Sequence, residues 1–272
     1  GVRTIKADLL DPVQAKAAID GSSHVYLCVG LLYNIKVWQQ DWPRVMQHVI
    51  DACAASGARL IFLDNVYMYG PSPLQVPFDE THSQIAVSEK GKIRKALADQ
   101  LMEAFASGKV KGLTGRAADF YGPGAKNSAF NFSVLERMLK GKAPQFISHR
   151  GIPHTYAYAP DLGRALVALA LDESTYGQVW HLPVGDPITA EEVAALINAE
   201  LGTNFKPAFL PGAMVTILSW FIPMLKEASE MLYQFNNEYV MSFEKFHRHF
   251  PDFKVTGYPE GIKKMVEFFR AG

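Results

Sequence analysis

The sequence predicts an α/β fold in which a parallel sheet is covered by helices on both faces and is followed by a smaller α/β cap. Over the first 185 residues, short apolar runs rich in β-branched side chains alternate with longer segments that suit helices. This alternation is typical of parallel strands joined by crossover helices. The expected strands are residues 2–7, 25–29, 60–63 and 113–117, and the expected helices are residues 12–19, 37–56, 88–107 and 130–140.

Composition narrows the class of protein. With 272 residues, 49% of them hydrophobic, the chain can bury a large core in one large or two modest domains. Its 27 basic residues balance its 27 acidic ones, so we expect no nucleic-acid partner. Cys28 and Cys53 supply neither a disulfide framework nor metal-ligand spacing, and His247 and His249 add no set of ligands at helical spacing. We therefore expect no metal and a reducing, cytoplasmic location.

The C-terminal third has a different character. Beyond residue 210 the pattern turns helical and rich in Met, Phe and Tyr, which predicts a cap over the carboxyl edge of the sheet. The longest apolar run, residues 213–225, is shorter than the roughly 20 residues that a membrane span needs, and it contains Pro223. We expect a buried helix or an oligomer contact there, and no membrane partner.

Several stretches, in a fixed order, carry a family resemblance. Residues 1–12 and 24–30 resemble the third and fourth strands of an extended short-chain dehydrogenase/reductase of the NAD-dependent epimerase/dehydratase family. Residues 59–70 are similar to the fifth strand with its Ser-Ser-x-x-Val-Tyr-Gly end, and residues 115–124 to the sixth strand, which runs into Tyr-Gly-Pro-Gly. The strand-helix pairs of the family's substrate half are matched by residues 154–170 and 177–197.

The resemblance implies two domains and a cofactor. A Rossmann-type, doubly wound dinucleotide-binding domain would comprise residues 1–145 with 152–172, and residues 173–272 would form mainly the substrate-binding cap. The family's glycine-rich turn does not occur in the sequence. We hypothesise that an N-terminal β-α-β segment of about 40 residues is missing, a little more than one such unit. Because the second strand reads the ribose 2′ position, the choice between NAD and NADP stays open.

Five residues match the family's contacts with adenosine. Asp8 and Leu9 correspond to the acidic-apolar pair beside the adenine, and Asp8 has the alternative role of capping the helix that follows it. Cys28, Val29 and Gly30 correspond to the small residues that let the backbone approach the ribose, for which a glycine is well suited.

The family's catalytic Tyr-x-x-x-Lys pair is absent. Aligning residues 89–101 with the family helix puts Lys90 or Gly91 at the Tyr position and Arg94 or Lys95 at the Lys position. The cation can still hold a cofactor ribose, whereas the proton relay is lost. Asn65 replaces the family Ser, and its amide can orient a carbonyl or hydroxyl without acting as an acid or base.

Two residues are candidates to replace the lost acid. Asp119 stands where the family often has a substrate-contacting Asn, so its carboxylate can act as acid/base or bind substrate hydroxyls, with loop capping as the alternative. Tyr67, after the fifth strand, is a second candidate. Tyr69 is expected to pack, Arg116 to form a structural ion pair, and Tyr121 to contact the cofactor.

Basic residues in one loop suggest substrate binding. Arg150 and His154, together with His149, lie where related enzymes bind the phosphate side of a nucleotide-linked substrate, and a solvated surface loop is the alternative. His181 replaces a family Asn and is expected to cap a turn.

Two classes of function follow from the resemblance. The first is a divergent NAD(P)-dependent epimerase/dehydratase or reductase that acts on a small-molecule substrate, a sugar or nucleotide sugar. The second is a non-catalytic NAD(P)-binding regulatory protein. The polar residues expected to line the pocket favour the enzyme. Helices 37–56 and 88–107 correspond to a pair that forms dimer interfaces in relatives, so we also expect a homodimer.

Overall fold

A parallel sheet forms the centre of the computed structural model, which describes residues 2–147, 149–210, 215 and 229–271. Its strands are β1 (His24–Leu27), β2 (Arg59–Asp64), β3 (Gly112–Arg116) and β7 (Val179–His181), in the order β1-β2-β3-β7 and all parallel. Apart from residue 215, the apolar run at residues 213–225 lies outside the described residues.

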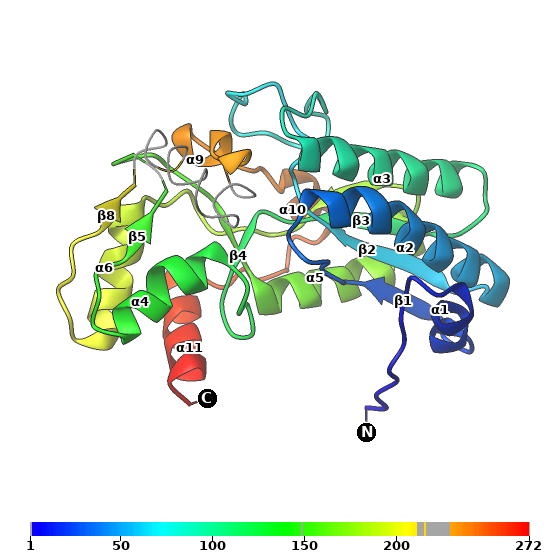
Figure 1. Cartoon of the computed structure of the whole chain (residues 1–272), viewed down its shortest axis with the longest axis horizontal. Helices are drawn as coiled ribbons and strands as arrows, with labels where there is room; N and C mark the ends of the chain where they lie inside the picture. Colours follow the sequence, from blue (N-terminus) through cyan, green and yellow to red (C-terminus); the bar gives the residue numbers. More distant parts are fainter. Residues whose placement is uncertain (1, 148, 211–214, 216–228, 272) are drawn as a thin grey trace.

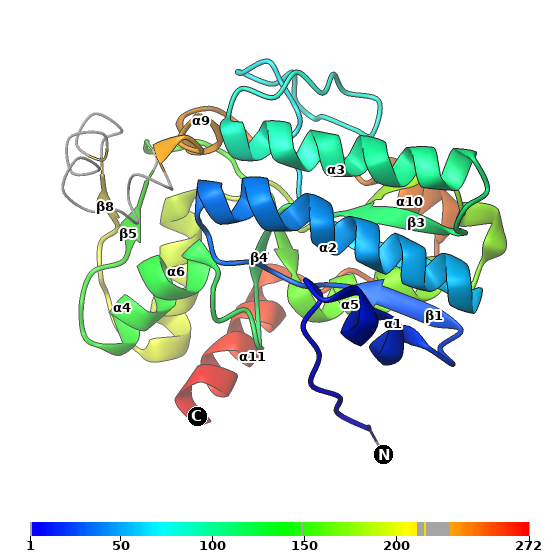
Figure 2. The ribbon, with the colours of Figure 1, turned by 45° about the vertical axis from the view of Figure 1, so that its right-hand side comes forward.

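Helices cover both faces of this sheet. α2 (Ile35–Ser56) and α3 (Glu89–Ala106) lie side by side on one face, and α5 (Ala159–Ala170) lies on the other (Figures 1 and 2). Successive side chains of β2 alternate between two core clusters: Phe62 packs on the α2–α3 side and Ile61 on the α5 side. The predicted α/β fold with a parallel sheet is confirmed.

The N-terminal segment agrees in part with prediction. α1 (Pro12–Ile19) has the predicted bounds, and its N-cap is Asp11, which accepts the backbone N–H groups of Val13 and Gln14. The strand predicted at residues 2–7 is wrong, because these residues form no regular structure and are largely exposed. A strand needs a neighbour to satisfy its backbone groups, and β1 pairs with β2 alone in the described sheet.

After β3 the chain starts a second, smaller sheet. β4 (Asp119–Tyr121) pairs in parallel with β6 (Tyr156–Tyr158), so that Asp119 lies opposite Tyr156. The helix predicted at residues 130–140 begins as a π-helix, η1 (Phe130–Leu135), and continues as α4 (Glu136–Leu139).

A third apolar cluster lies at the far end of the molecule from β1. It joins η1, α4 and β4 to α6 (Ala190–Leu201) and α11 (Tyr258–Ala271), next to the two-stranded sheet of β5 (Gln145–Phe146) and β8 (Ala208–Phe209). Because β7 lies in the main sheet and α6 in this cluster, residues 177–197 are divided between the two regions instead of lying together in the substrate half. The remaining short helices are η2 (Glu173–Thr175), α9 (Tyr233–Asn236) and α10 (Glu244–His249).

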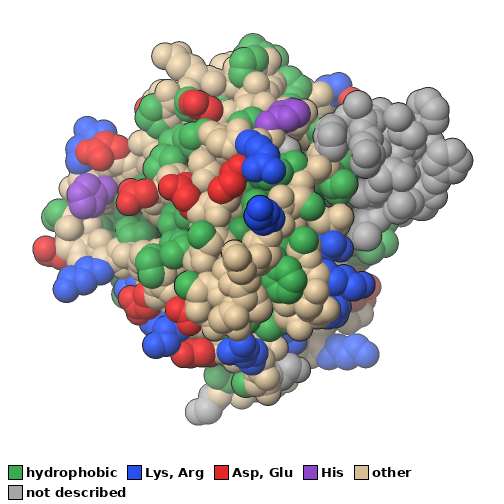
Figure 3. Space-filling model, turned by 90° about the vertical axis from the view of Figure 1, so that its left-hand side faces the viewer, with side chains coloured by type: hydrophobic (Ala, Val, Ile, Leu, Met, Phe, Trp, Pro, Cys, Tyr) green, Lys and Arg blue, Asp and Glu red, His purple; other side chains and the backbone are tan. Residues whose placement is uncertain are grey.

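Acidic and basic side chains are intermixed on the face of the α6 end of the molecule (Figure 3). Within the described part of the chain, no helix combines the length and the apolar character needed to cross a membrane.

Candidate functional site

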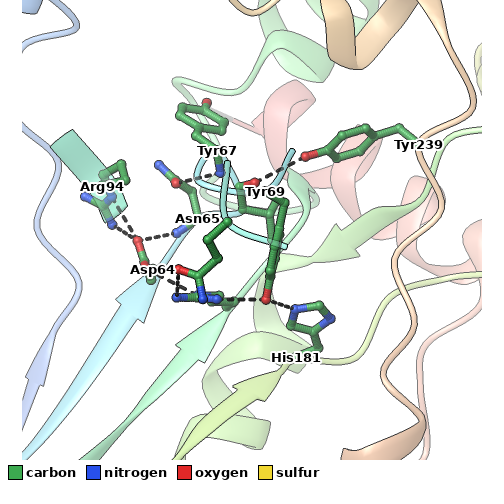
Figure 4. Close-up of polar contacts among 10 residues, drawn as sticks. Asp64, Asn65, Tyr67, Tyr69, Arg94, His181 and Tyr239 are labelled. Atoms are coloured by element: carbon green, nitrogen blue, oxygen red, sulfur yellow. Dashed lines mark hydrogen bonds and ion pairs between the residues drawn. The ribbon is translucent and has the colours of Figure 1, made fainter. Parts of the chain in front are cut away.

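Polar side chains gather at the carboxyl edge of the main sheet, where β2 ends at Asp64, β3 at Arg116 and β7 at His181. Parallel strands end at a common edge, which is where ligands of such folds bind. The Asp64 side chain is fully buried there. Arg94 of α3 binds its Oδ1 through Nε at 2.8 Å and through Nη2, and Arg116 Nε lies 3.7 Å from its Oδ2 (Figure 4). The carboxylate is thus enclosed by two guanidinium groups.

A second set of bonds extends this cluster across the sheet. Arg116 Nη1 donates to the Tyr69 hydroxyl at 2.8 Å, and that hydroxyl lies 2.6 Å from His181 Nε2 (Figure 4). His181 Nδ1 lies 2.8 Å from the Ser242 carbonyl oxygen, which can only accept, so Nδ1 carries the proton and Nε2 accepts from Tyr69.

Burial determines how these two groups ionise. It lowers the pKa of His181 to about 3 and raises the pKa of Tyr69 to about 12, although the Arg116 charge opposes the second shift. Both groups are therefore neutral at physiological pH. The turn-capping role predicted for His181 is wrong, because its ring is buried in β7 between partners that are distant in sequence.

The structure brings Asp119 and His154 together. Asp119 begins β4, and His154 precedes the paired strand β6. His154 Nε2 lies 3.0 Å from Asp119 Oδ2. The His154 side chain is 7% exposed and that of Asp119 is 30% exposed, so the carboxylate is the part of the pair that solvent reaches.

Aromatic rings hold the imidazole in place. The His154 ring stacks on Phe235 with centroids 5.5 Å apart and an interplanar angle of 9°, and on Tyr239 at 5.4 Å and 18°. Tyr156 packs at 4.6 Å with its ring tilted by 39°. The orientation of the imidazole toward Asp119 is therefore set by segments distant in sequence.

Four phenol groups lie close enough to Asp119 for its charge to act on them. Burial raises the pKa of all four, and the negative charge of Asp119 raises it further; these are Tyr67, Tyr156, Tyr233 and Tyr239. All four remain protonated at neutral pH and can act as hydrogen-bond donors, not as bases.

Tyr67 and Asn65 follow β2 within this region. The half-buried Tyr67 ring stacks over Trp38 of α2 at 6.5 Å. Asn65 Oδ1 accepts the Tyr67 backbone N–H at 3.1 Å, so its amide shapes the turn that places Tyr67 (Figure 4). The roles predicted for these two residues stay predictions.

Side-chain burial in α3 favours the alignment that puts Lys90 at the family's Tyr position and Arg94 at its Lys position. Lys90 and Arg94, four residues apart, are both buried, whereas the Lys95 side chain is 41% exposed and its Nζ pairs with Asp99 at 2.6 Å. Lys90 and Arg94 are therefore the inward pair. Arg94, expected to hold a cofactor ribose, is instead bound to Asp64 and covered by the Trp42 ring, 4.7 Å away.

Two other predicted site residues have different surroundings. The Tyr121 side chain is completely buried in the third cluster, where its ring packs 5.4 Å from that of Tyr258. Arg150 is exposed and lies 3.8 Å from Glu191. Of the two substrate-binding candidates in their loop, His154 is thus the one that contacts Asp119.

The segment expected to meet adenosine is accessible. Cys28 and Gly30 are exposed beyond the carboxyl end of β1. Among the described residues other than its two chain neighbours, no heavy atom lies within 4 Å of where a Gly30 side chain would begin. Leu9 and Val29 pack against the same core cluster, so the two predicted contact segments are held by common packing. Asp8 is exposed, and its Oδ1 accepts the Leu10 backbone N–H at 2.9 Å.

Two surface grooves lie elsewhere. One of about 460 Å³ runs between α6 and the start of α11, and another of about 310 Å³ follows β7 and the segment before α10; neither is lined by Asp119 or His154. Among the described residues, no group of three or more His, Cys, Asp or Glu is arranged to hold a metal ion.

Several site residues were missed by sequence reasoning. Asp64 ends the apolar run of the fifth strand, which is a local signal of a functional strand end. Phe235 and Tyr239 gave no such signal, because their partner at the site, His154, lies far away in the sequence.

The sequence matches no protein-family model and no curated protein. Solved structures do match. An epimerase from Methanothermobacter thermautotrophicus aligns with a TM-score of 0.80 and 14% identity over 98% of this chain and 78% of its own. A dTDP-glucose 4,6-dehydratase from Streptomyces venezuelae, solved as a double mutant with NAD, gives 0.77 and 13% over 98% and 79%. A UDP-glucuronic acid 4-epimerase from Bacillus cereus, also solved with NAD, gives 0.76 and 15% over 98% and 80%. The inferred resemblance is confirmed as a structural match: the chain has the fold of NAD-dependent epimerases and dehydratases.

Proposed function

We propose that the chain binds NAD or NADP and catalyses a hydride-transfer reaction on a sugar or nucleotide-sugar-like substrate, with Asp119 and His154 moving the proton. The observation that carries the proposal is the 3.0 Å contact between His154 Nε2 and Asp119 Oδ2 where the β4–β6 pair begins, shortly after β3 ends. The fold, and the NAD bound in structures that share it, support a dinucleotide as the partner.

Different residues would hold the cofactor and move the proton. Asp8, Leu9, Cys28, Val29 and Gly30 would hold the adenosine, and the nicotinamide, when bound, supplies or accepts the hydride. The proposal leaves out Lys95, Arg94 and Tyr121, since the first is paired on the surface and the other two are enclosed.

Asp119 has the access that acid/base chemistry requires. A carboxylate oxygen can only accept, so Asp119 Oδ2 accepts a hydrogen bond from His154 Nε2–H. Its Oδ1 has no hydrogen-bond partner among the described residues, and solvent reaches the side chain, so this oxygen is available to a substrate hydroxyl. Tyr67, held protonated by burial, would donate a hydrogen bond to the developing oxygen.

One observation favours the second function, a non-catalytic NAD(P)-binding regulator. Arg94, the cation at the family's Lys position, is neutralised by Asp64, so the usual support for a nicotinamide ribose is missing. Such a protein would bind the cofactor and leave substrates unchanged.

A cofactor titration followed by a substrate panel tests the proposal. NADH and NADPH are titrated into the protein by fluorescence, and sugar nucleotides are then added to the same samples. We expect cofactor binding and slow cofactor turnover that Asp119→Asn abolishes and that Asp99→Asn, a change in an exposed carboxylate, leaves intact. Cofactor binding without turnover on any substrate would favour the regulator, and no binding of either cofactor would contradict both functions.

A further inference from the structure

Residues 239–242 lie between two other segments of the chain and are bonded to both. On one side the Tyr239 backbone N–H donates to the Pro153 carbonyl oxygen at 3.1 Å, and the Tyr239 carbonyl oxygen accepts the Thr155 backbone N–H at 3.1 Å. On the other side Phe78 makes two backbone hydrogen bonds to the segment, at 2.9 and 2.8 Å. The 239–242 segment is therefore held along both of its edges.

The buried hydroxyl of Thr155 fixes the position of this segment along its neighbour. Thr155 Oγ1 accepts the Met241 backbone N–H at 3.1 Å and donates to the Tyr239 carbonyl oxygen at 3.4 Å. One hydroxyl thus bonds to two backbone groups that are two residues apart. A shift of the segment would leave the buried Met241 N–H without this acceptor, which is unfavourable.

The position of the 239–242 segment determines where the Tyr239 ring lies. That ring stacks on the His154 imidazole with centroids 5.4 Å apart and an interplanar angle of 18°. The far end of the ring is also held, because Gln234 Nε2 donates to the Tyr239 hydroxyl at 2.6 Å. A ring fixed at both ends restricts the tilt of the imidazole beside it, whose Nε2 lies 3.0 Å from Asp119 Oδ2.

We propose that Thr155 and Tyr239 are positioning residues for His154. The Thr155 hydroxyl holds the 239–242 segment in register, and the Tyr239 ring then holds the imidazole with Nε2 against Asp119. A displacement of about 1 Å in a reacting group can cost about 10²-fold in rate, so this support affects proton transfer although neither residue transfers a proton itself. The inference rests on the proposed function, in which Asp119 and His154 move the proton.

Thr155→Val tests the inference in the protein without substrate. The change keeps the branched shape of the side chain and removes its hydroxyl. The readout is the exchange with water of the His154 Nε2–H proton, followed by nitrogen-edited NMR and identified by its absence from His154→Gln. We expect this proton to exchange at least about tenfold faster in Thr155→Val than in the wild-type protein, because the imidazole leaves Asp119 more often. Thr155→Ser keeps the hydroxyl and should restore the slow exchange.

Thr175→Val provides a matched control for the loss of a buried hydroxyl. Thr175 is also buried, and its Oγ1 donates to the Leu169 and Asp172 carbonyl oxygens, both at 2.8 Å. We expect both valine variants to lower Tm, and only Thr155→Val to accelerate the exchange of the His154 proton.

A second variant removes the stacked ring and leaves the Thr155 hydroxyl in place. Tyr239→Leu should also accelerate the exchange of the His154 proton, and it decides the question if Thr155→Val does not fold.

Turnover gives a second readout that separates positioning from stability. We expect kcat to fall about 10–100-fold in Thr155→Val and to recover in Thr155→Ser. The substrate KM should change by less than about twofold, because the lost support acts on the reacting groups and not on substrate binding.

Exchange at the wild-type rate in folded Thr155→Val or Tyr239→Leu would overturn the inference, as would equal acceleration in Thr175→Val or in Thr155→Ser. Such a result would leave the roles of Asp119 and His154 standing. If the wild-type protein turned over no substrate while the exchange responded as expected, the proposed function would fail and the positioning of His154 would stand.

Discussion

Asp64 and Asp119 are both carboxylates near the carboxyl ends of strands, yet their surroundings differ. Asp64 lies between two buried guanidinium groups and has no exposed area, whereas Asp119 faces one imidazole and keeps 30% of its side chain exposed. A carboxylate closed in by fixed positive charges holds the sheet edge together. One that pairs with a single imidazole and has an open side suits proton exchange with a ligand. Both residues therefore lie at the sheet edge, and they differ in whether solvent reaches the side chain.

The largest effect on stability is expected at the closed carboxylate. Asp64→Asn leaves Arg94 and Arg116 buried with no other ion-pair partner among the described residues, so we expect the free energy of unfolding to fall by about 3–5 kcal/mol. Urea unfolding measures it. Asp119→Asn, at a more exposed pair, should cost less than about 1 kcal/mol. Equal losses for the two variants would remove the distinction between the two sites.

Replacing Tyr69 tests whether its hydroxyl belongs to the buried cluster of Asp64, Arg94 and Arg116. Tyr69→Phe leaves Arg116 Nη1 and His181 Nε2 without this partner, and each is buried. We expect a loss of about 1–3 kcal/mol in the free energy of unfolding, the usual cost of an unsatisfied buried polar group. The same measurement on Tyr26→Phe, at an exposed phenol, provides the control. An unchanged free energy of unfolding in Tyr69→Phe would show that the stabilising cluster ends at Arg116.

Acid should lower the free energy of unfolding, because His181 resists protonation in the folded protein. Its pKa is about 3 in the folded protein and 6.5 ordinarily, so below pH 6.5 the unfolded chain gains a proton that the native state does not take. This group is neutral in both states at higher pH, and its contribution to stability is lost as the pH falls toward 3. The expected loss is about 1.4 kcal/mol per pH unit in that window. Unfolding curves of the wild-type protein and His181→Gln should differ in slope by this amount between about pH 6 and 4, and equal slopes would show that His181 takes up a proton in the native state.

The smallest effect is expected at Lys95. Its exposed pair with Asp99 should be worth less than about 0.5 kcal/mol, so Lys95→Gln should change neither the unfolding curve nor cofactor affinity appreciably. A clear loss of NADH or NADPH affinity in the fluorescence titration would instead restore Lys95 to the cofactor site and reverse the assignment of the inward face of α3.

Local patterns in the sequence predicted the main elements well. α1 has the predicted bounds, and α2 and α3 differ from prediction by at most two residues at either end, because their apolar periodicity and caps are local features. The strand at residues 2–7 failed because a strand depends on a neighbour. His181 was misassigned for a similar reason, since its partners Tyr69 and Ser242 come from other segments.

Only part of the site was predictable residue by residue, and its arrangement was not. Asp119 and His154 were each singled out for a separate role, and their contact depends on the parallel pairing of β4 with β6. The locking of Arg94 by Asp64 depends in the same way on the packing of α3 against the sheet. Such juxtapositions follow from tertiary packing, which sequence spacing does not encode.

The most direct test is the turnover of Asp119→Asn and His154→Gln, with bound cofactor and the best substrate of the panel, measured beside their free energies of unfolding. The account predicts a loss of about 10²–10⁴-fold in turnover for Asp119→Asn, with cofactor affinity and stability nearly unchanged, and a smaller loss for His154→Gln. Turnover at the wild-type rate in a correctly folded Asp119→Asn protein would contradict it.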